Sequence, residues 1–496
     1  MRQATLARAC GLGVKFCLVA AAVFSVRVAS VMADPPLPTF DSTVFNVTVA
    51  NANINGGVAA STASADNSAA INAYIAYCSS QGGGTVEIPA GTFLSSTITM
   101  QSNVNLQIDG GGILRDSNYA NTLITTSGST SNMEISGGGI IDGAATTTAS
   151  STDLVLLKKV NGLEVTGVTI ENAGHEHLVT ENDGNVTIKG ITIADPGTLA
   201  ANGGKYISNT DGIDFSGANF LIENNTISDG DDNIVAKPAS TATSNITITH
   251  DTIGAGHGIS IGGGSAAGLS NMTVSYVTFN GTQNGLRIKA EDAAGGNAGG
   301  GTAHPVNGVT YSDITMTNVA NPIVIDSFYN GNNNFPSSPL DAAAYPATPS
   351  AQDSTTPFFE NIVFDDITAT GASNGGLIYG LNTSPQSVQW LTFKNVNITA
   401  DSHMDLWYAS DVTADGLTVI VPIADPYANA SPINGVFLSN VTFAPVTDAV
   451  PLPPAVWQTL PSLLLLFGAY RLYGRPSRRL RNAQKYPSSL STRIPV

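Results

Sequence analysis

The sequence predicts an all-β protein folded as a single-domain, right-handed parallel β-helix with a short N-terminal capping helix. Two observations lead to this prediction: short β-branched segments recur along the chain, each followed by Asn, Gly or Asp, and helical periodicity is almost absent. A repeat of this kind is typical of a solenoid whose stacked coils bury one continuous core. A β-sandwich is the alternative, but its hairpins would not keep one phase over many repeats.

The recurring segments are three residues long and start at residue 168. Between the central residues of the first six, the separations are 23, 34, 26, 26 and 37 positions. Each reads as a short strand closed by a turn. The nine segments are Val168–Ile170, Ile191–Ile193, Asn225–Ile227, Asp251–Ile253, Val277–Phe279, Ile314–Met316, Ile367–Ala369, Val396–Ile398 and Val441–Phe443.

One amphipathic helix is expected over Asp66–Cys78, where Ile71 and Ile75 lie four apart and a polar residue at 66–68 can act as N-cap. We expect this helix to cover the first coil, which otherwise presents an open strand edge. The repeat is interrupted by a short insertion at Gly295–Gly301 and by a long loop at Gly331–Phe358, after which it resumes.

The first 33 residues have the pattern of a secretory signal peptide. Basic residues precede the uncharged stretch Phe16–Val26, and Val31-Met32-Ala33 offers a cleavage site before Asp34. The apolar stretch is well short of the roughly 20 residues that span a membrane. Cleavage after Ala33 would leave Cys78 as the one cysteine, so we expect no intrachain disulfide in the mature protein.

The C-terminal segment, residues 451–496, joins an uncharged stretch that ends at Tyr470 to an arginine-rich tail. The uncharged stretch begins at Val450-Pro451-Leu452-Pro453, and the segment resembles the PEP-CTERM-type sorting signals of Gram-negative bacteria. A plain C-terminal anchor is the alternative. Either way, membrane contact is expected only through this segment before processing, and the protein is expected outside the cell or at the cell surface. The domain between the two segments is expected to span residues 34–450.

Charge is distributed unevenly along the chain. It has 20 Lys and Arg residues against 37 Asp and Glu residues, a net charge of −17. Residues 34–450 hold nine of the cations and all 37 acids, so this part carries −28. A nucleic acid is therefore excluded as a partner, because phosphate binding needs clustered Lys and Arg.

Four polar clusters fall in consecutive repeats: Asn209–Gly212, Gly230–Asn233, Gly256–Gly258 and Arg287–Lys289. Each cluster also has an ordinary structural explanation. In the same order, these are a turn closed by Asn and Asp side chains, a solvent-exposed turn, a hydrogen-bonded histidine and a structural salt bridge. However, Asp231 and His257 each lie five residues after the Thr of their repeat, which puts them at the same place on neighbouring coils, about 4.8 Å apart. Their joint occurrence favours one site.

These motifs, in this order, resemble those of the polygalacturonases of glycoside hydrolase family 28. The resemblance extends over residues 66–450 and includes Gly83–Phe93; its most specific strings are Asn209–Asp214 and Gly256–Gly262. Asn233 stands where the family usually has Cys. The resemblance implies a parallel β-helix that hydrolyses α-1,4-linked galacturonate with inversion, so the partner is an acidic polysaccharide.

The resemblance also implies catalytic roles. Asp231 would be the general acid, Asp211 and Asp232 would hold and activate the attacking water, and His257 would hydrogen-bond near the acid and help to keep it protonated. The crowding of the three Asp residues also favours an acid role for one of them, because ionising three neighbouring carboxyl groups together costs free energy. The pKa of one should rise, and that group can serve as the acid.

Substrate-binding residues follow from the same resemblance. Arg287 and Lys289 would grip the carboxylate of the sugar at the cleavage point. The remaining candidates are Asn209, Gly258, Tyr329 and His177, the last with a place in the cleft wall.

No metal or cofactor is expected. His175 and His177 could face one way as a metal pair, but the sequence offers no third ligand, and no calcium motif occurs. Calcium-dependent lyase chemistry is therefore disfavoured. We expect a monomer.

Three points stay open at the level of sequence. The substrate could be another uronate polymer, such as rhamnogalacturonan or xylogalacturonan, and a non-catalytic surface or matrix protein is a further alternative. Endo and exo action depend on the insertions, although Lys237 faintly resembles exo-acting members of the family.

Overall fold

The computed structural model describes residues 33–61, 65–119, 121–262, 267–290, 304–327, 329, 358–431, 433, 436–439 and 441–443. All of these residues belong to one compact unit that ends at Ala444. A second unit, Pro445–Val496, lies outside the described residues. So do the predicted signal peptide up to residue 32, the insertion at Gly295–Gly301 and the loop at Gly331–Phe358 except for Phe358.

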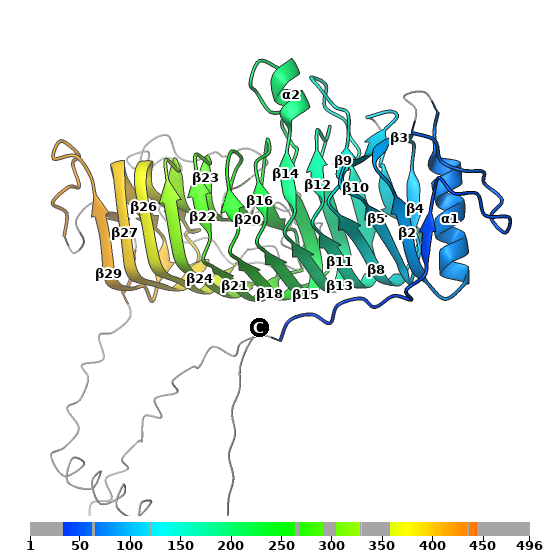
Figure 1. Cartoon of the computed structure of the whole chain (residues 1–496). Coiled ribbons are helices and arrows are strands. Elements are labelled where there is room, and N and C mark those ends of the chain that lie inside the picture. Colours follow the sequence, from blue (N-terminus) through cyan, green and yellow to red (C-terminus); the bar gives the residue numbers. More distant parts are fainter. Residues whose placement is uncertain are drawn as a thin grey trace, which may run out of the picture. The chain divides into compact units, whose positions relative to one another are not determined.

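The strands form three rows in which each strand pairs in parallel with its counterpart on the next coil (Figure 1). Some long strands turn a corner and serve two or three rows. The first row contains β1 (Val44–Asn46), β2 (Gly84–Ile88), β5 (Val104–Ile108), β8 (Thr130–Gly137), β11 (Val160–Thr166), β18 (Thr243–Thr249), β21 (Leu269–Ser275) and β28 (Ala409–Ser410).

The second row contains β3 (Gly91–Ser95), β6 (Gly112–Asp116), β9 (Ile140–Asp142), β12 (Thr169–Glu171), β14 (Thr192–Ala194), β16 (Thr226–Ile227), β19 (Thr252–Ile253) and β22 (Thr278–Asn280). The third row contains β4 (Ile98–Met100), β7 (Ile124–Thr126), β10 (Val155–Lys158), β17 (Ile234–Ala236), β20 (Ile259–Gly262), β23 (Asn284–Lys289), β25 (Asn321–Asp326) and β30 (Val436–Ser439). The shared strands are β13 (Leu178–Lys189), β15 (Ile213–Glu223), β24 (Val306–Thr317), β26 (Phe359–Tyr379), β27 (Val388–Trp407) and β29 (Thr413–Ile420).

The register confirms the repeat that the sequence predicts. The first eight predicted segments all lie in the second row, where Thr169 pairs with Thr192, Thr192 with Thr226, and so on along the coils. The ninth segment departs from it, because Phe443 bridges to Val412 instead. The parallel β-helix is thus confirmed, and its right-handed sense stays a prediction.

Alternation along each strand divides core from surface. In β18, Ile246 and Ile248 are fully buried, whereas Thr247 and Thr249 between and after them are half-buried. Successive side chains of a strand point to opposite faces, so one face of every row fills the core and the other is free to carry polar groups.

Two helices interrupt the strands in the part of the chain that the structure describes. α1 (Ser68–Ser80) starts and ends two residues later than predicted and contacts β2, β4 and β5. The later start arises because Asp66 accepts hydrogen bonds from the amides of Ser68 and Ser96 and so belongs to the preceding connection. Ile71 and Ile75 are buried in α1, as expected. That α1 shields an open strand edge stays a prediction.

The second helix, α2 (Pro196–Ala201), was not predicted and lies between β14 and β15. Among the described residues, neither helix is long and apolar enough to cross a bilayer.

Candidate active site

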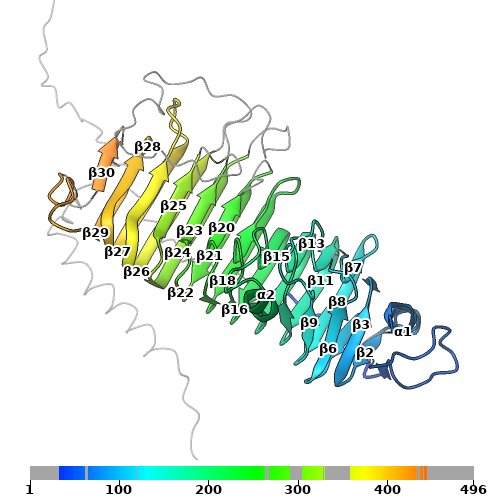
Figure 2. The ribbon, with the colours of Figure 1, turned by 90° about the horizontal axis from the view of Figure 1, so that it is seen from above.

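The third row carries the predicted catalytic clusters on its outer face. Its strands β20, β23 and β25 lie side by side (Figure 2). Backbone hydrogen bonds join the corners before β15, β17 and β20 from coil to coil: the Gly212 amide donates to the Asp232 carbonyl, and the Asn233 amide donates to the Gly258 carbonyl. Arg287 and Lys289 reach Asp232 from β23, so the four clusters meet.

Asp231 and His257 form one pair. The imidazole Nδ1 lies 2.8 Å from Asp231 Oδ1, and the two side chains are 21% and 29% exposed, respectively. Burial disfavours the charged form of Asp231, but the hydrogen bond from His257 and the charge of Lys289 together outweigh burial and hold the pKa of this carboxyl below its usual range. Solvent reaches this carboxyl group, unlike that of Asp232.

Asp232 is buried and surrounded by donors. Lys289 Nζ lies 2.7 Å from Asp232 Oδ2, and Arg287 and Ser260 both reach Oδ1. Burial raises the pKa of Asp232, yet the charges of Arg287 and Lys289 overcome this and bring it far below the ordinary value. Asp232 therefore stays ionised and cannot donate a proton.

Asp211 is held by a lysine that the sequence interpretation undervalued. Lys237 Nζ lies 2.9 Å from Asp211 Oδ2 and 2.8 Å from Glu176 Oε1, and it also contacts Asp214. Burial raises the pKa of Asp211 to about 6, against the lowering effect of Lys237. The pKa of Lys237 is raised, because the three carboxylates outweigh its burial, so the ammonium stays charged.

The expected rise in the pKa of one crowded carboxyl group therefore occurs at Asp211 and not at Asp231, the predicted general acid. The pKa is raised at Asp211, and burial raises it even further at Asp214, whereas at Asp231 it is lowered. The sequence places the carboxylates together but does not show which of them receives a cation. The strand register shows which carboxylate receives a cation. Lys237 directly follows Ala236, and Ala236 pairs with Phe215, which lies on the same coil as Asp211.

The predicted substrate-binding residues fall into two groups. Asn209 is exposed, with φ at +57°, and Tyr329 is half-buried with its ring centroid 4.7 Å from Lys289 Nζ. Both can meet a ligand. Arg287 and Lys289 point to one face, as predicted, but both are buried and bind Asp232, so the structural salt bridge is present as well.

Two assignments are corrected. His177 is fully buried, with Nδ1 3.0 Å from the Asp211 carbonyl and Nε2 2.9 Å from Asp195 Oδ1, so it does not line a cleft. Gly258 is buried too: its amide donates to Asn233 Oδ1, and a Cβ there would lie 2.2 Å from the Asn284 carbonyl oxygen. Its role is close backbone packing rather than contact with substrate.

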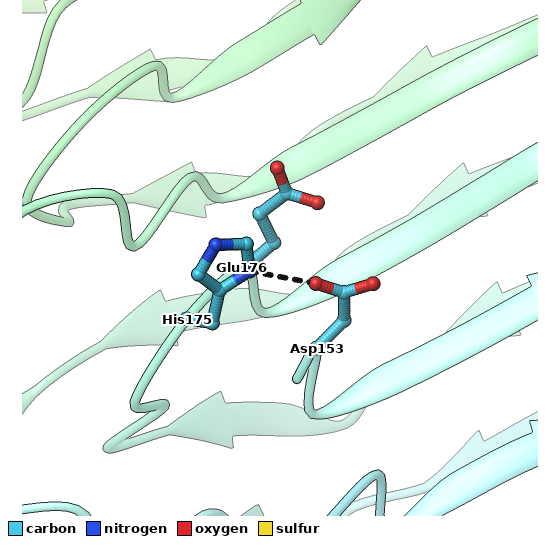
Figure 3. A group of neighbouring side chains, drawn as sticks. All are labelled: Asp153, His175 and Glu176. Carbon is cyan, nitrogen blue, oxygen red and sulfur yellow. Dashed lines mark hydrogen bonds and ion pairs between the residues drawn. The ribbon is translucent and has the colours of Figure 1, made fainter. Parts of the chain in front are cut away.

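His175 and His177 do not form the metal pair that their spacing allowed, because only His175 faces outward. Its Nδ1 lies 2.8 Å from Asp153 Oδ1, with Glu176 beside it (Figure 3). Glu176 also forms a second close group with Asp211 and Asp214. The Lys237 ammonium contacts all three of these carboxylates and so occupies the position that a metal ion would take.

Asn233, which replaces the usual Cys, has a positioning role that the sequence did not reveal. Its side-chain amide donates to Asp229 Oδ2 and to the Ala255 carbonyl, while its oxygen accepts from Gly258. It thereby fastens the loop of Asp231 to the loop of His257.

Comparison with known proteins agrees with this geometry. Residues 78–419 match the model of the glycosyl hydrolases family 28. The endo-polygalacturonase of Pectobacterium carotovorum subsp. carotovorum is 31% identical over 377 residues, which cover 67% of this chain and 83% of that protein. The endo-polygalacturonase of Pectobacterium parmentieri is 30% identical over 366 residues, covering 64% and 81%.

Solved structures show the same fold. The polygalacturonase from Erwinia carotovora ssp. carotovora has a TM-score of 0.59 and 27% identity, and the match covers 77% of this chain and 99% of that one. An exopolygalacturonase from Thermotoga maritima has a TM-score of 0.60 at 18% identity, covering 77% and 94%. The chain therefore belongs to family 28 of the glycosyl hydrolases and is a glycoside hydrolase.

Proposed function

We propose that this enzyme is a polygalacturonase that hydrolyses α-1,4-galacturonosidic bonds in galacturonan with inversion. The observation that carries the proposal is the different treatment of three neighbouring carboxyl groups. Asp231 is hydrogen-bonded to His257 and reached by solvent, Asp232 is held ionised by two cations, and Asp211 has a pKa of about 6. Glycosidases need two carboxyl groups in opposite protonation states.

In this proposal Asp231 is the general acid. It is partly exposed, whereas Asp232 is nearly inaccessible. His257 holds the carboxyl group of Asp231 in place through their hydrogen bond. As substrate displaces water, the charged form of Asp231 loses its solvation, so the carboxyl group takes up a proton and delivers it to the departing glycosidic oxygen. The bond from the anomeric carbon to that oxygen breaks, and the departing oxygen becomes a hydroxyl group.

Asp211 is the proposed base. In its ionised form it accepts a proton from the attacking water, while the fixed charge of Asp232 orients that water. Asp232 itself is a poor base, because Arg287 and Lys289 stabilise its carboxylate. Asn209 and Tyr329 are proposed to contact the sugar, and Arg287 and Lys289 to attract its carboxylate.

The stereochemistry of the reaction depends on which carboxylate acts as the base. One carboxyl oxygen each of Asp231 and Asp232 lie within 4.8 Å of each other, near the spacing of retaining enzymes. Inversion is proposed because Asp211, not Asp232, is the base and because the family resemblance implies it. Proton NMR of early products decides: the β-anomer is expected first from an α-linked substrate, and the α-anomer would exclude inversion.

The activity itself is tested with Asp231→Asn. This variant keeps an acceptor for His257 but has no carboxyl proton, so we expect turnover of polygalacturonate to fall by 10²-fold or more with an unchanged melting temperature. Release of reducing ends is the measurement. Wild-type turnover in the variant would remove Asp231 from the mechanism. Failure of the unmodified enzyme to cleave polygalacturonate would favour another uronate polymer or a non-catalytic role.

We also propose that the enzyme is exported through residues 1–33 and sorted through residues 451–496, with residues 34–450 as the hydrolase domain. The support is the sequence pattern of the two basic, apolar ends. Mass spectrometry of the protein recovered from outside the cell tests both parts, since the mature chain is expected to begin at Asp34 and to lack the arginine-rich tail.

A further inference from the structure

A column of left-handed residues runs along one corner of the coils, at the start of the first row. Each coil contributes one residue, and the registers of the flanking strands place these residues directly above one another. Their φ angles lie between +53° and +75°. From β13 to β27 the column consists of Asn185, Asn219, Asn245, Asn271, Gly308, Asn361 and Trp390.

Asparagine and glycine suit this column for physical reasons. Both tolerate the left-handed region better than other residues, and stacked side-chain amides can bond to each other. The Asn219 amide donates to Asn185 Oδ1 at 3.1 Å, Asn245 donates to Asn219 at 3.0 Å, and Asn271 continues the series to Asn245 at 2.8 Å. The column is therefore a structural ladder of amides.

Trp390 breaks this rule. A bulky side chain at φ of +53° is a backbone outlier that costs free energy, and an indole cannot take the place of the amide in the ladder. Burial does not compensate, because Trp390 is 45% exposed. Strained residues that the fold does not need are associated with function.

A groove of about 1150 Å³ lies beside Trp390 and crosses the coils from β18 to β27. Four coil spacings give it a length of about 19 Å, which suits several sugar rings. Hydroxyl groups of Thr273, Thr310 and Thr392 and the amide of Asn271 line it. None of the described residues that line the groove is Asp, Glu, Lys or Arg.

This lining matches one class of ligand. An exposed indole offers a flat apolar face to the C–H side of a sugar ring, and hydroxyl and amide groups bond to its hydroxyls. A polyanion is disfavoured, because the described residues of the groove include no lysine or arginine and the hydrolase domain carries −28. We propose that this groove binds a stretch of uncharged polysaccharide, with a sugar ring stacked on Trp390.

The groove is separate from the candidate active site. It lies on the first row, whereas Asp231 and Arg287 belong to the third row, on the other side of the corner that follows β20 and β23. Binding there would hold the enzyme on its polymer without taking part in cleavage. The proposal stands without the proposed function, and only the choice of probe depends on it.

The test uses the full enzyme with Asp231→Asn, so that nothing is cleaved, and compares it with the same protein carrying Trp390→Asn as well. The added substitution restores the residue that the ladder favours, so we expect folding to be intact and the melting temperature to be equal or higher. The probe is highly methyl-esterified galacturonan, an uncharged polymer, and binding is followed by quenching of tryptophan fluorescence and by affinity electrophoresis.

We expect Trp390→Asn to weaken binding of this probe at least tenfold, while Trp390→Phe retains part of it. Binding of de-esterified polygalacturonate should stay within twofold, and so should hydrolysis of trigalacturonate when Trp390→Asn is made alone. Equal affinity for the methyl-esterified polymer with and without Trp390, or an equal loss for the polyanion, would overturn the proposal. Loss of polygalacturonate cleavage by the unmodified enzyme would contradict the proposed function only, since binding is measured separately.

Discussion

Lys237 determines the protonation state of the proposed base. It is the cation that lowers the pKa of Asp211, which burial would otherwise raise above its value of about 6. Without Lys237, Asp211 would therefore become ionised only at higher pH, and Asp214 and Glu176 would repel its charge.

We predict that Lys237→Met moves the acidic limb of the pH profile of kcat/KM upward by about one unit or more. Lys237→Arg keeps the charge and is expected to leave the limb close to its original position. The pH profile on polygalacturonate is the measurement, together with circular dichroism as a check of folding. An unchanged acidic limb in folded Lys237→Met would mean that Asp211 is not the group whose ionisation limits the rate.

Arg287 is proposed to attract the sugar carboxylate and is also paired with Asp232. This second contact changes the expected effect of removing the guanidinium. If Arg287 only gripped the sugar carboxylate, Arg287→Ala would fold normally and bind the uronate weakly. In the structure the guanidinium is buried against Asp232 and Ser260. Removing it leaves a buried carboxylate with one cation fewer, which costs on the order of 3 kcal/mol.

A double-mutant cycle separates the two roles of Arg287. We predict that Asp232→Asn restores most of the stability lost in Arg287→Ala, whereas the dissociation constant of trigalacturonate stays raised in the double variant. Denaturant unfolding and calorimetric titration are the measurements. If the affinity of Asp232→Asn for the sugar were unchanged by the loss of Arg287, the guanidinium would have only a structural role.

Single residues also show how far sequence reasoning reached at the site. The phase of the repeat placed Asp231 and His257 on neighbouring coils, and the structure brings them into contact, because a stacked repeat converts equal phase into proximity. Asp211, Asp232, Arg287 and Lys289 came from motifs on consecutive repeats, and the roles of all six residues stay predictions. His177 and Gly258 were misjudged, since a motif does not reveal which of its members turn inward. Lys237 was undervalued because its partners lie on other coils.

At the level of single elements, the corner before β19 contains a buried titratable residue, Asp251. Asp251 is buried, and its Oδ1 accepts hydrogen bonds from the backbone and side-chain amides of Asn225. Burial raises the pKa of Asp251 to about 8 despite these bonds. Its carboxyl group is therefore protonated in the folded state at pH values where it is ionised in the unfolded chain.

This difference affects stability in one direction. Because the folded pKa exceeds the unfolded value of 3.8, folding takes up a proton between the two values, and the free energy of unfolding falls as pH rises from about 4 to about 8. Asp251→Asn removes the titration and keeps the accepting oxygen. We predict that the variant gains up to about 4 kcal/mol relative to wild type between pH 5 and pH 8.

Denaturant unfolding at the two pH values measures this gain. Asp41→Asn is a suitable control, because Asp41 is exposed and its pKa is lowered by hydrogen bonds from Thr43 rather than raised. A stability difference between wild type and Asp251→Asn that is equal at pH 5 and pH 8 would show that Asp251 does not titrate in this range.

The second-row strands were the elements best predicted from sequence. Eight of the nine segments stack in register, because a central Thr or Asn followed by an apolar residue has the alternation that a coil wall needs. The strands of the third row were harder to predict, since their sequences lack a clear period and contain turn residues and polar functional groups. α2 was missed because six residues are too few for a helical pattern.

For the whole molecule, the relevant quantity is the field of a domain with nine cations and 37 acids. A polyanionic substrate is repelled at long range and attracted only near Arg287 and Lys289. Salt screens the long-range part first, since the Debye length falls from about 30 Å at 0.01 M to about 8 Å at 0.15 M.

We therefore predict that kcat/KM on long polygalacturonate rises severalfold between these two salt concentrations, because repulsion weakens. Trigalacturonate, which carries few charges, should respond much less and serves as the control. Initial rates at low substrate concentration are the measurement. A steady fall in kcat/KM on the polymer with added salt would indicate that attraction by the two cations dominates at every distance.

The order of the coils has a consequence for how the molecule loses structure. A stack held together by nearest-neighbour contacts opens from its ends, where each coil has one neighbour instead of two. The coils that carry Asp211, Asp231, His257 and Arg287 are interior ones, with further coils stacked before β13 and after β23. Fraying at either end therefore leaves the chemistry in place, and the outer coils protect the reactive ones against local opening.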